Sequence, residues 1–98
     1  MALARICWLA REEGGRRTPF TGRRYVTVAR FAESEADWTM EAWSLVSVFR
    51  EADPGAQCPL ADVEFLVAEA PHHLLHPGSR FELLEGYRVV ARGEVLAE

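Results

Sequence analysis

Residues 80–96 read RFELLEGYRVVARGEVL and contain the clearest structural signal in the chain. Arg80–Leu84 and Tyr87–Leu96 both interleave apolar residues with single charged residues, as strands with one buried face do. Between them, Glu85-Gly86 predicts a two-residue hairpin turn in which the glycine takes a positive φ. We therefore predict an antiparallel hairpin over this stretch.

Similar short runs precede the hairpin. In Arg24–Phe31, alternation directs Tyr25, Thr27, Ala29 and Phe31 to one face and the valines between them to the other. Ala4–Ala10 and Asp62–Glu69 are predicted to be strands on the same grounds. Glycine and proline punctuate the connections. The expected connections are residues 12–22, the turn Asp53-Pro54-Gly55 and residues 71–78.

The segment Glu33–Glu51 is ambiguous. Its acidic start is followed by an apolar, aromatic stretch from Trp38 to Phe49. Ala42, Leu45, Val46 and Phe49 would share one face of a helix, whereas the valines and tryptophans favour a strand. We predict a strand.

Six short strands with no convincing helix predict an all-β fold. We expect a single domain over residues 1–98, a small six-stranded antiparallel β-barrel. A barrel is preferred to a sandwich because closure removes strand edges that so short a chain could hardly cover.

Charge is unevenly distributed, although the net charge is only −4. Residues 1–30 carry seven arginines against two glutamates, and residues 31–69 carry nine acids against Arg50 alone. The acidic total argues against indiscriminate nucleic-acid binding, but a local basic patch remains possible. No apolar run is long enough for a membrane helix and no secretory signal is evident, so we expect a cytoplasmic protein.

Two stretches carry a family resemblance. Residues 13–20 read EGGRRTPF and are followed by Gly22 and Arg24. The second stretch has the pattern Gly78-x-Arg80-Phe81, Glu85-Gly86-x-Arg88-x-Val90 and Gly93-x-Val95. In order and spacing both resemble the third, C-terminal β-barrel domain of elongation factor Tu. Residues 32–61 depart from the family, since they lack its Thr-Asp-Val-Thr-Gly and Met-Pro-Gly-Asp segments.

The resemblance implies a binding role. In that family the domain packs on a GTPase domain, touches the stem of aminoacyl-tRNA and receives the nucleotide-exchange partner. It implies that Gly14 and Gly15 lie where the family meets its GTPase domain, and that Arg24 and Gly86–Arg88 face the tRNA side. The phosphate-binding Gly-x-x-x-x-Gly-Lys-Ser/Thr loop is absent, so we expect no nucleotide, no cofactor and no catalysis.

We expect the chain to engage a protein partner, and the resemblance implies a partner of the translation machinery. RNA binding to a tRNA-like stem is the alternative. Arginine forks can bind phosphates or an acidic protein surface, but they could also pair with the chain's own acids. Tryptophans in the divergent segment could be core residues or exposed anchors. The expected contact residues are Gly14, Gly15, Arg16, Arg17, Arg23, Arg24, Trp38, Trp43 and Arg88.

The remaining reactive residues predict no separate chemistry. Without a secretory signal, Cys7 and Cys58 are expected to be reduced thiols, with a disulfide between them as the less favoured alternative. His72, His73 and His76 with Cys58 suggest a metal site at first, but a His-His-x-x-His loop does not fix ligand geometry. We expect ordinary surface imidazoles and no metal.

Overall fold

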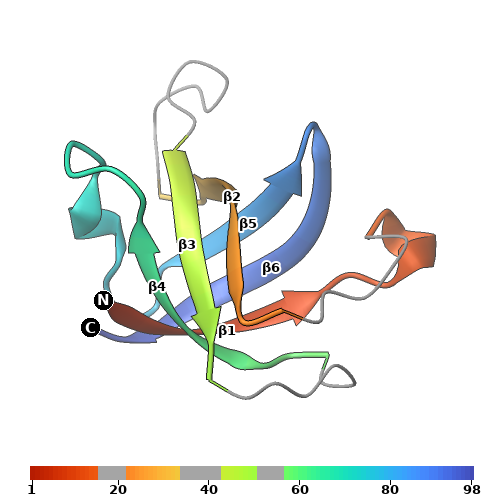
Figure 1. The fold of residues 1–98 in the computed structure, drawn as a ribbon, viewed down its shortest axis with the longest axis horizontal. Coiled ribbons are helices and arrows are strands. Elements are labelled where there is room, and N and C mark those ends of the chain that lie inside the picture. Colours follow the sequence, from red (N-terminus) through yellow and green to blue (C-terminus); the bar gives the residue numbers. More distant parts are fainter. Residues whose placement is uncertain (16–21, 34–42, 51–56) are drawn as a thin grey trace.

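A computed structural model describes residues 1–15, 22–33, 43–50 and 57–98. Six antiparallel strands close into a barrel, and the predicted fold class is confirmed (Figure 1). No helix in the described part of the chain has the length and apolar character needed to cross a bilayer. The elements are β1 (Ala2–Trp8), η1 (Arg11–Glu13), β2 (Arg24–Phe31), β3 (Trp43–Phe49), β4 (Leu60–Phe65), η2 (His72–Leu74), β5 (Arg80–Glu85) and β6 (Arg88–Ala97).

The barrel closes in the order β1-β4-β3-β2-β5-β6 and returns to β1. β1 therefore pairs on both sides, with Ala4 opposite Ala61 of β4 and Ile6 opposite Gly93 of β6. Every strand has two neighbours, so the sheet has no free edge.

Most strand boundaries lie close to the predictions. Arg24–Phe31 is a strand over its full predicted length, and Trp43–Phe49 confirms a strand in the ambiguous segment. The predicted strand Asp62–Glu69 is wrong at its end, because β4 stops at Phe65. There the ladder with β3 finishes on the bond from Leu66 N–H to Ser44 C=O, at 3.0 Å, and the chain turns away.

Two other boundaries are shifted. The first strand is Ala2–Trp8 rather than Ala4–Ala10, since Ala10 already accepts the hydrogen bonds of the next turn. The hairpin turn is one residue later than predicted, because Glu85 and Arg88 pair across it. Gly86 has the predicted positive φ, 66°.

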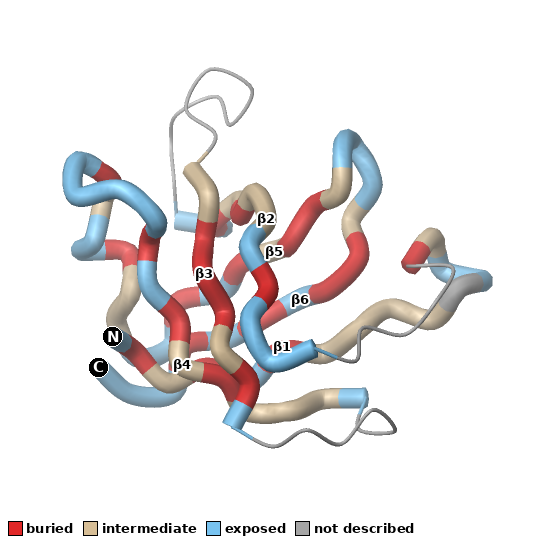
Figure 2. The backbone as a smooth tube through the Cα atoms, in the orientation of Figure 1, coloured by how far each residue is buried: buried red, intermediate tan, exposed pale blue. Residues whose placement is uncertain are grey.

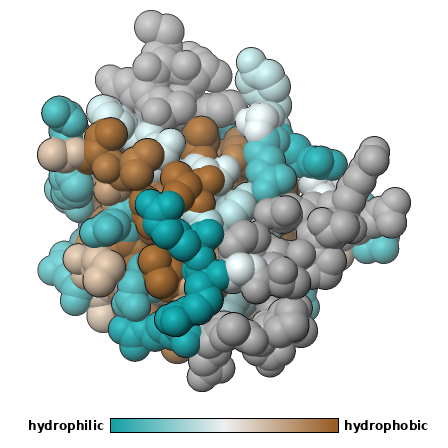
Figure 3. Space-filling view, viewed as in Figure 1, coloured by the Kyte–Doolittle hydropathy of each residue, from teal (hydrophilic) through white to brown (hydrophobic). Residues whose placement is uncertain are grey.

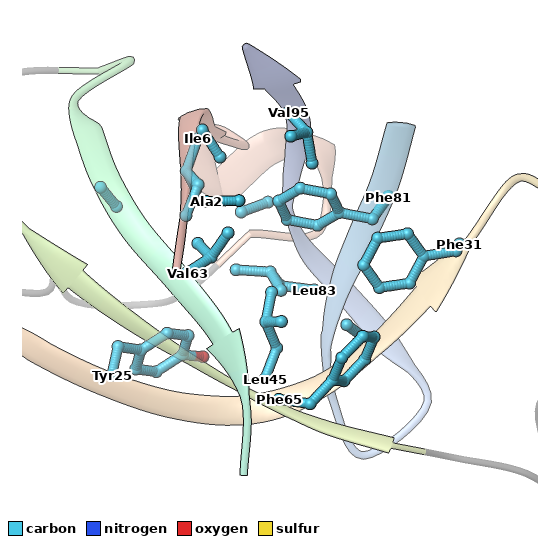
Figure 4. Packing of buried hydrophobic residues seen from close by; sticks show 14 of the residues in the cluster. Ala2, Ile6, Tyr25, Phe31, Leu45, Val63, Phe65, Phe81, Leu83 and Val95 are labelled. Atoms are coloured by element: carbon cyan, nitrogen blue, oxygen red, sulfur yellow. The ribbon is translucent and has the colours of Figure 1, made fainter. Parts of the chain in front are cut away.

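The barrel interior is filled by the inward row of each strand (Figure 2). Phe31 packs against Phe81 and Phe65, with ring centroids 5.1 and 5.5 Å apart. Phe81 lies directly over Gly93, where an added Cβ would be 2.2 Å from the ring. Figure 4 shows these side chains converging from different strands. The large, fully buried hydrophobic side chains are Ile6, Leu45, Val63, Leu83, Leu84, Val90 and Val95.

The pairing of β2 with β5 is short and is continued by side chains. The ladder runs only from Phe31 opposite Phe81 to Val28 opposite Leu84. Beyond it, the Thr27 hydroxyl donates to the Leu84 carbonyl, and the Tyr25 hydroxyl donates to the Glu85 carboxylate. Side-chain hydrogen bonds thus hold the two strands together where backbone bonds end.

Cys7 and Cys58 form a disulfide across 51 positions of sequence, so the expectation of reduced thiols is wrong. The β1–β4 register continues past Leu60: Ile6 N–H donates to Pro59 C=O at 3.0 Å, and Trp8 N–H donates to Gln57 C=O at 2.9 Å. This places the cysteines directly opposite each other at a non-hydrogen-bonded position, with Cα atoms 4.0 Å apart.

We expect reduction of this disulfide to lower the free energy of unfolding by about 2–4 kcal/mol, because the bond closes a long loop in the unfolded chain. Urea denaturation with and without a dithiol reductant measures the difference. The double variant Cys7→Ser/Cys58→Ser serves as the control and should not respond to the reductant. Equal stability of the oxidised and reduced wild-type chain would contradict this expectation.

Candidate binding surface at the arginine end

Antiparallel strand order gathers the connections at two opposite ends of the barrel. We call one the arginine end: it comprises the described residues that follow β1 (9–15), precede β2 (22–23), follow β3 (50), precede β4 (57–59) and join β5 to β6 (86–87), with the adjoining strand residues Arg24 and Arg88. In Figure 1 the coloured parts of these segments lie on the right and lower sides. The other we call the histidine end, formed by the end of β2, the start of β3 and residues 66–79.

The expected contact residues divide between these ends. Gly14, Gly15, Arg23, Arg24 and Arg88 all belong to the arginine end. Trp43 opens β3 and therefore lies at the histidine end. The other three expected residues lie outside the described part of the chain: Arg16, Arg17 and Trp38.

Three arginines of the arginine end are exposed and form no ion pair with a carboxylate of the described residues, although Arg88 lies opposite Glu85 in the β5–β6 register. These are Arg23, Arg24 and Arg88. The Arg23 side chain donates to the carbonyl of Phe49 at 3.4 Å, which orients the group without neutralising its charge. Positive charge therefore remains available to an anionic partner at this end.

Other arginines of the barrel are paired with acids. Arg50 donates to Asp62 at 2.9 Å, and this hydrogen bond lowers the pKa of the Asp62 carboxyl, which partial desolvation opposes. The Arg30–Glu82 contact is also an ion pair. Looser pairs, at 3.7 and 3.8 Å, join Arg80 to Glu94 and Arg92 to Glu82. Arg23, Arg24 and Arg88 differ from these arginines because they form no ion pair with a described carboxylate.

An aromatic cluster supports the arginine end from inside the barrel. Trp8 contacts Tyr25 edge-to-face at 5.4 Å, and it contacts Phe49 at 5.8 Å between ring centroids. Trp8 and Phe49 end β1 and β3, and Tyr25 is the second residue of β2, so the cluster packs where these strands meet their connections. The arginines consequently project from a firmly packed base.

The Gly14-Gly15 pair has a local structural reason. Gly14 has φ of +95°, and a Cβ on Gly15 would be 2.1 Å from the carbonyl oxygen of Leu9. The turn is held by Ala10, whose carbonyl accepts from Glu13 N–H and Gly15 N–H at 2.9 and 3.0 Å. Both glycines are therefore needed to shape the turn, whether or not a partner touches it.

Tyr87 is an exposed residue of this end that the sequence analysis did not single out. It lies in the β5–β6 turn beside Arg88 and is 89% exposed. Tyrosine and arginine are the residue types most enriched at protein-binding hot spots. The sequence could have indicated Tyr87, because it is the variable residue x of the Glu85-Gly86-x-Arg88 turn.

Trp43 is half-buried and packs against the core. Part of its ring therefore stabilises the barrel, and only the remainder is open to a partner. Apolar surface also occurs at the histidine end, where β4 finishes beside β3 (Figure 3). Leu66 and Val67 are 51% and 41% exposed there.

The histidines do not join Cys58. They lie at the histidine end, whereas Cys58 is in the disulfide at the arginine end. His72 bonds the carbonyl of Ala68 at 2.9 Å, and His76 pairs with Glu33 at 2.8 Å. Within the described ranges, no three His, Cys, Asp or Glu side chains are grouped to hold a metal ion.

His76 has acceptors at both ring nitrogens. Nε2 faces the Glu33 carboxylate, and Nδ1 faces the Pro77 carbonyl at 3.0 Å. Only the protonated imidazole can donate to both. The Glu33 hydrogen bond first, and the Pro77 bond second, raise the pKa of His76 above its usual 6.5.

This raised pKa predicts a pH dependence. Protonation of His76 stabilises the fold fully below its unfolded pKa, near 6.5, and the contribution disappears as pH rises through the higher folded pKa. Thermal unfolding across that range should show the decline in the wild type and a flatter profile in His76→Asn. An NMR titration giving an ordinary or lowered His76 pKa would disprove the assignment.

No protein-family model matches the chain, and no curated protein is significantly similar to it. The function of the chain is therefore inferred from the barrel and from the chemistry of its two ends.

Proposed function

We propose that this barrel is a non-catalytic binding module that engages an acidic surface of a protein partner through the arginine end. The observation that carries the proposal is the concentration of exposed arginines without carboxylate partners there: Arg23, Arg24 and Arg88. Guanidinium groups form bidentate hydrogen bonds with carboxylates, and desolvation at an interface strengthens them.

The surroundings of these arginines suit a protein partner. Tyr87 adds an exposed aromatic side chain beside Arg88, and the aromatic cluster beneath keeps the bases of the connections fixed. A packed base reduces the conformational entropy lost on association. A rigid surface that combines tyrosine with arginine is the usual composition of a protein-binding hot spot.

The same proposal includes a relationship to the C-terminal barrel of elongation factor Tu, and with it a cytoplasmic partner in the translation machinery. Support comes from the position of the resembling residues in the barrel. The Gly14-Gly15 turn follows β1, Arg24 opens β2, and the second motif spans the β5–β6 hairpin. The first two, and the Glu85-Gly86-x-Arg88 part of the second motif, lie at the arginine end.

RNA is the second candidate, because unpaired arginines bind phosphates as readily as carboxylates. It predicts an affinity that falls steeply with salt, since each neutralised phosphate releases counterions. Direct binding of a tRNA-like stem at low and high ionic strength measures this dependence.

The proposal is tested by affinity capture with matched variants. Arg24→Glu/Arg88→Glu should reduce recovery of the partner from the cell lysate by about tenfold or more, which corresponds to about 1.4 kcal/mol. Arg80→Glu is the control: Arg80 is also exposed, but it belongs to the histidine side of β5 and faces Glu94. This variant should retain the partner.

Parallel capture with ribonuclease separates the two candidates. A single protein retained near stoichiometry after ribonuclease treatment, and lost only in the double variant, supports the protein partner. Recovery that collapses with ribonuclease replaces it with RNA. Equal recovery by all variants would remove the arginine end as the binding surface.

A further inference from the structure

The Cys7–Cys58 disulfide lies on the outer face of the barrel. Along β1, Ala4 and Ile6 point inward and are fully buried, so the intervening side chains, including that of Cys7, point outward. Cys7 and Cys58 are both half-buried. The disulfide is therefore partly open to solvent and does not belong to the apolar interior.

Two arginines lie at strand positions next to this disulfide. Arg92 of β6 is the direct cross-strand partner of Cys7, and it is exposed and only loosely paired with Glu82 at 3.8 Å. Arg5 lies two residues before Cys7 on the same face, and its Nη1 donates to the Cys58 carbonyl at 3.1 Å. Two arginines of the outer face thus neighbour the disulfide, one across the strand pair and one along β1.

Such surroundings have two chemical consequences. Neighbouring cations stabilise a thiolate, which makes Cys7 the better leaving group when the disulfide opens. They also attract carboxylates and hold them by forked hydrogen bonds. We propose that Cys7–Cys58 is a thiol–disulfide exchange site for small anionic thiols of the glutathione class.

The exchange is a two-electron reduction in two steps. The thiolate of the first small thiol attacks Cys58 Sγ, the Cys7–Cys58 bond breaks, and Cys7 leaves as a thiolate beside Arg92 and Arg5. A second small thiolate then attacks the sulfur of the first small thiol in the mixed disulfide and releases Cys58 as a thiolate. The products are two cysteine thiols, which take up the two protons lost by the small thiols, and one small-molecule disulfide.

The opened site would affect the arginine end directly. Without the disulfide, Gln57–Pro59 is held to β1, among the described residues, by the backbone bonds from Ile6 and Trp8 and by the Arg5 side chain, because Pro59 has no N–H to donate. Trp8 also supports the aromatic cluster. The redox state of the pair is therefore coupled through Trp8 to the base of the proposed binding surface.

The test compares thiols of opposite charge on the intact wild-type protein. Thiol titration follows the opening of the disulfide by glutathione, which carries two carboxylates, and by cysteamine, a cation, at equal thiolate concentration. Glutathione should react faster by a factor on the order of ten, because the flanking charges attract it. The ratio of the glutathione rate to the cysteamine rate should fall towards one in Arg5→Gln/Arg92→Gln. It should stay unchanged in Arg80→Gln, which removes one charge from β5, the strand on the far side of β6.

A second variant traps the intermediate. Cys7→Ser leaves Cys58 as a free thiol. Oxidised glutathione should add one glutathionyl group to this thiol, which mass spectrometry detects. The proposal is overturned if the native wild type releases no thiols with glutathione, if the charge preference survives in Arg5→Gln/Arg92→Gln, or if the folded Cys7→Ser variant forms no mixed disulfide.

Discussion

The two-sided pairing of β1 is the constraint on which the rest of the structure depends. β1 bonds to β4 through four register pairs and to β6 along nearly its whole length, and this closes the sheet. Closure gives each strand one face toward a common interior, so a short chain can bury a continuous core. It also fixes the β1–β4 register, which brings Cys7 opposite Cys58. Without closure, both strands beside the seam would expose unpaired backbone groups.

Closure also gathers particular side chains at the two ends of the barrel. Arginines on the middle of the strands face glutamates of the neighbouring strands, as in the pair Arg30–Glu82. Where the strands end, Arg24 lies opposite Val48, and neither Arg24 nor Arg23 forms an ion pair with a carboxylate of the described residues. Because alternate connections return to the same end, the unpaired arginines are collected at one side of the molecule. The histidines and the exposed part of Trp43 are collected at the other.

The sequence was sufficient to predict the barrel and the alternation of β2, because period-two patterns and glycine turns are local signals. It predicted contact residues that include Gly14, Gly15, Arg23, Arg24 and Arg88. It did not show that these five share one end, because their common position follows only from the strand order. The disulfide was mispredicted because it depends on the β1–β4 register between residues 51 positions apart. β4 was predicted too long because Leu66 and Val67 continue the apolar pattern after their partner strand has finished.

Hydrogen exchange of the β1 amides, read residue by residue by NMR, tests closure of the barrel most directly. In a closed barrel, alternate amides of β1 bond to β4 and to β6, so Ala4 through Trp8 should all be protected to the level of the most stable strands. Nuclear Overhauser contacts should join Cys7 to both Cys58 and Arg92. Rapid exchange of every second β1 amide would show that one of its two neighbours is missing. An open sheet of that kind would contradict both the closed barrel and the gathering of the arginines at one end.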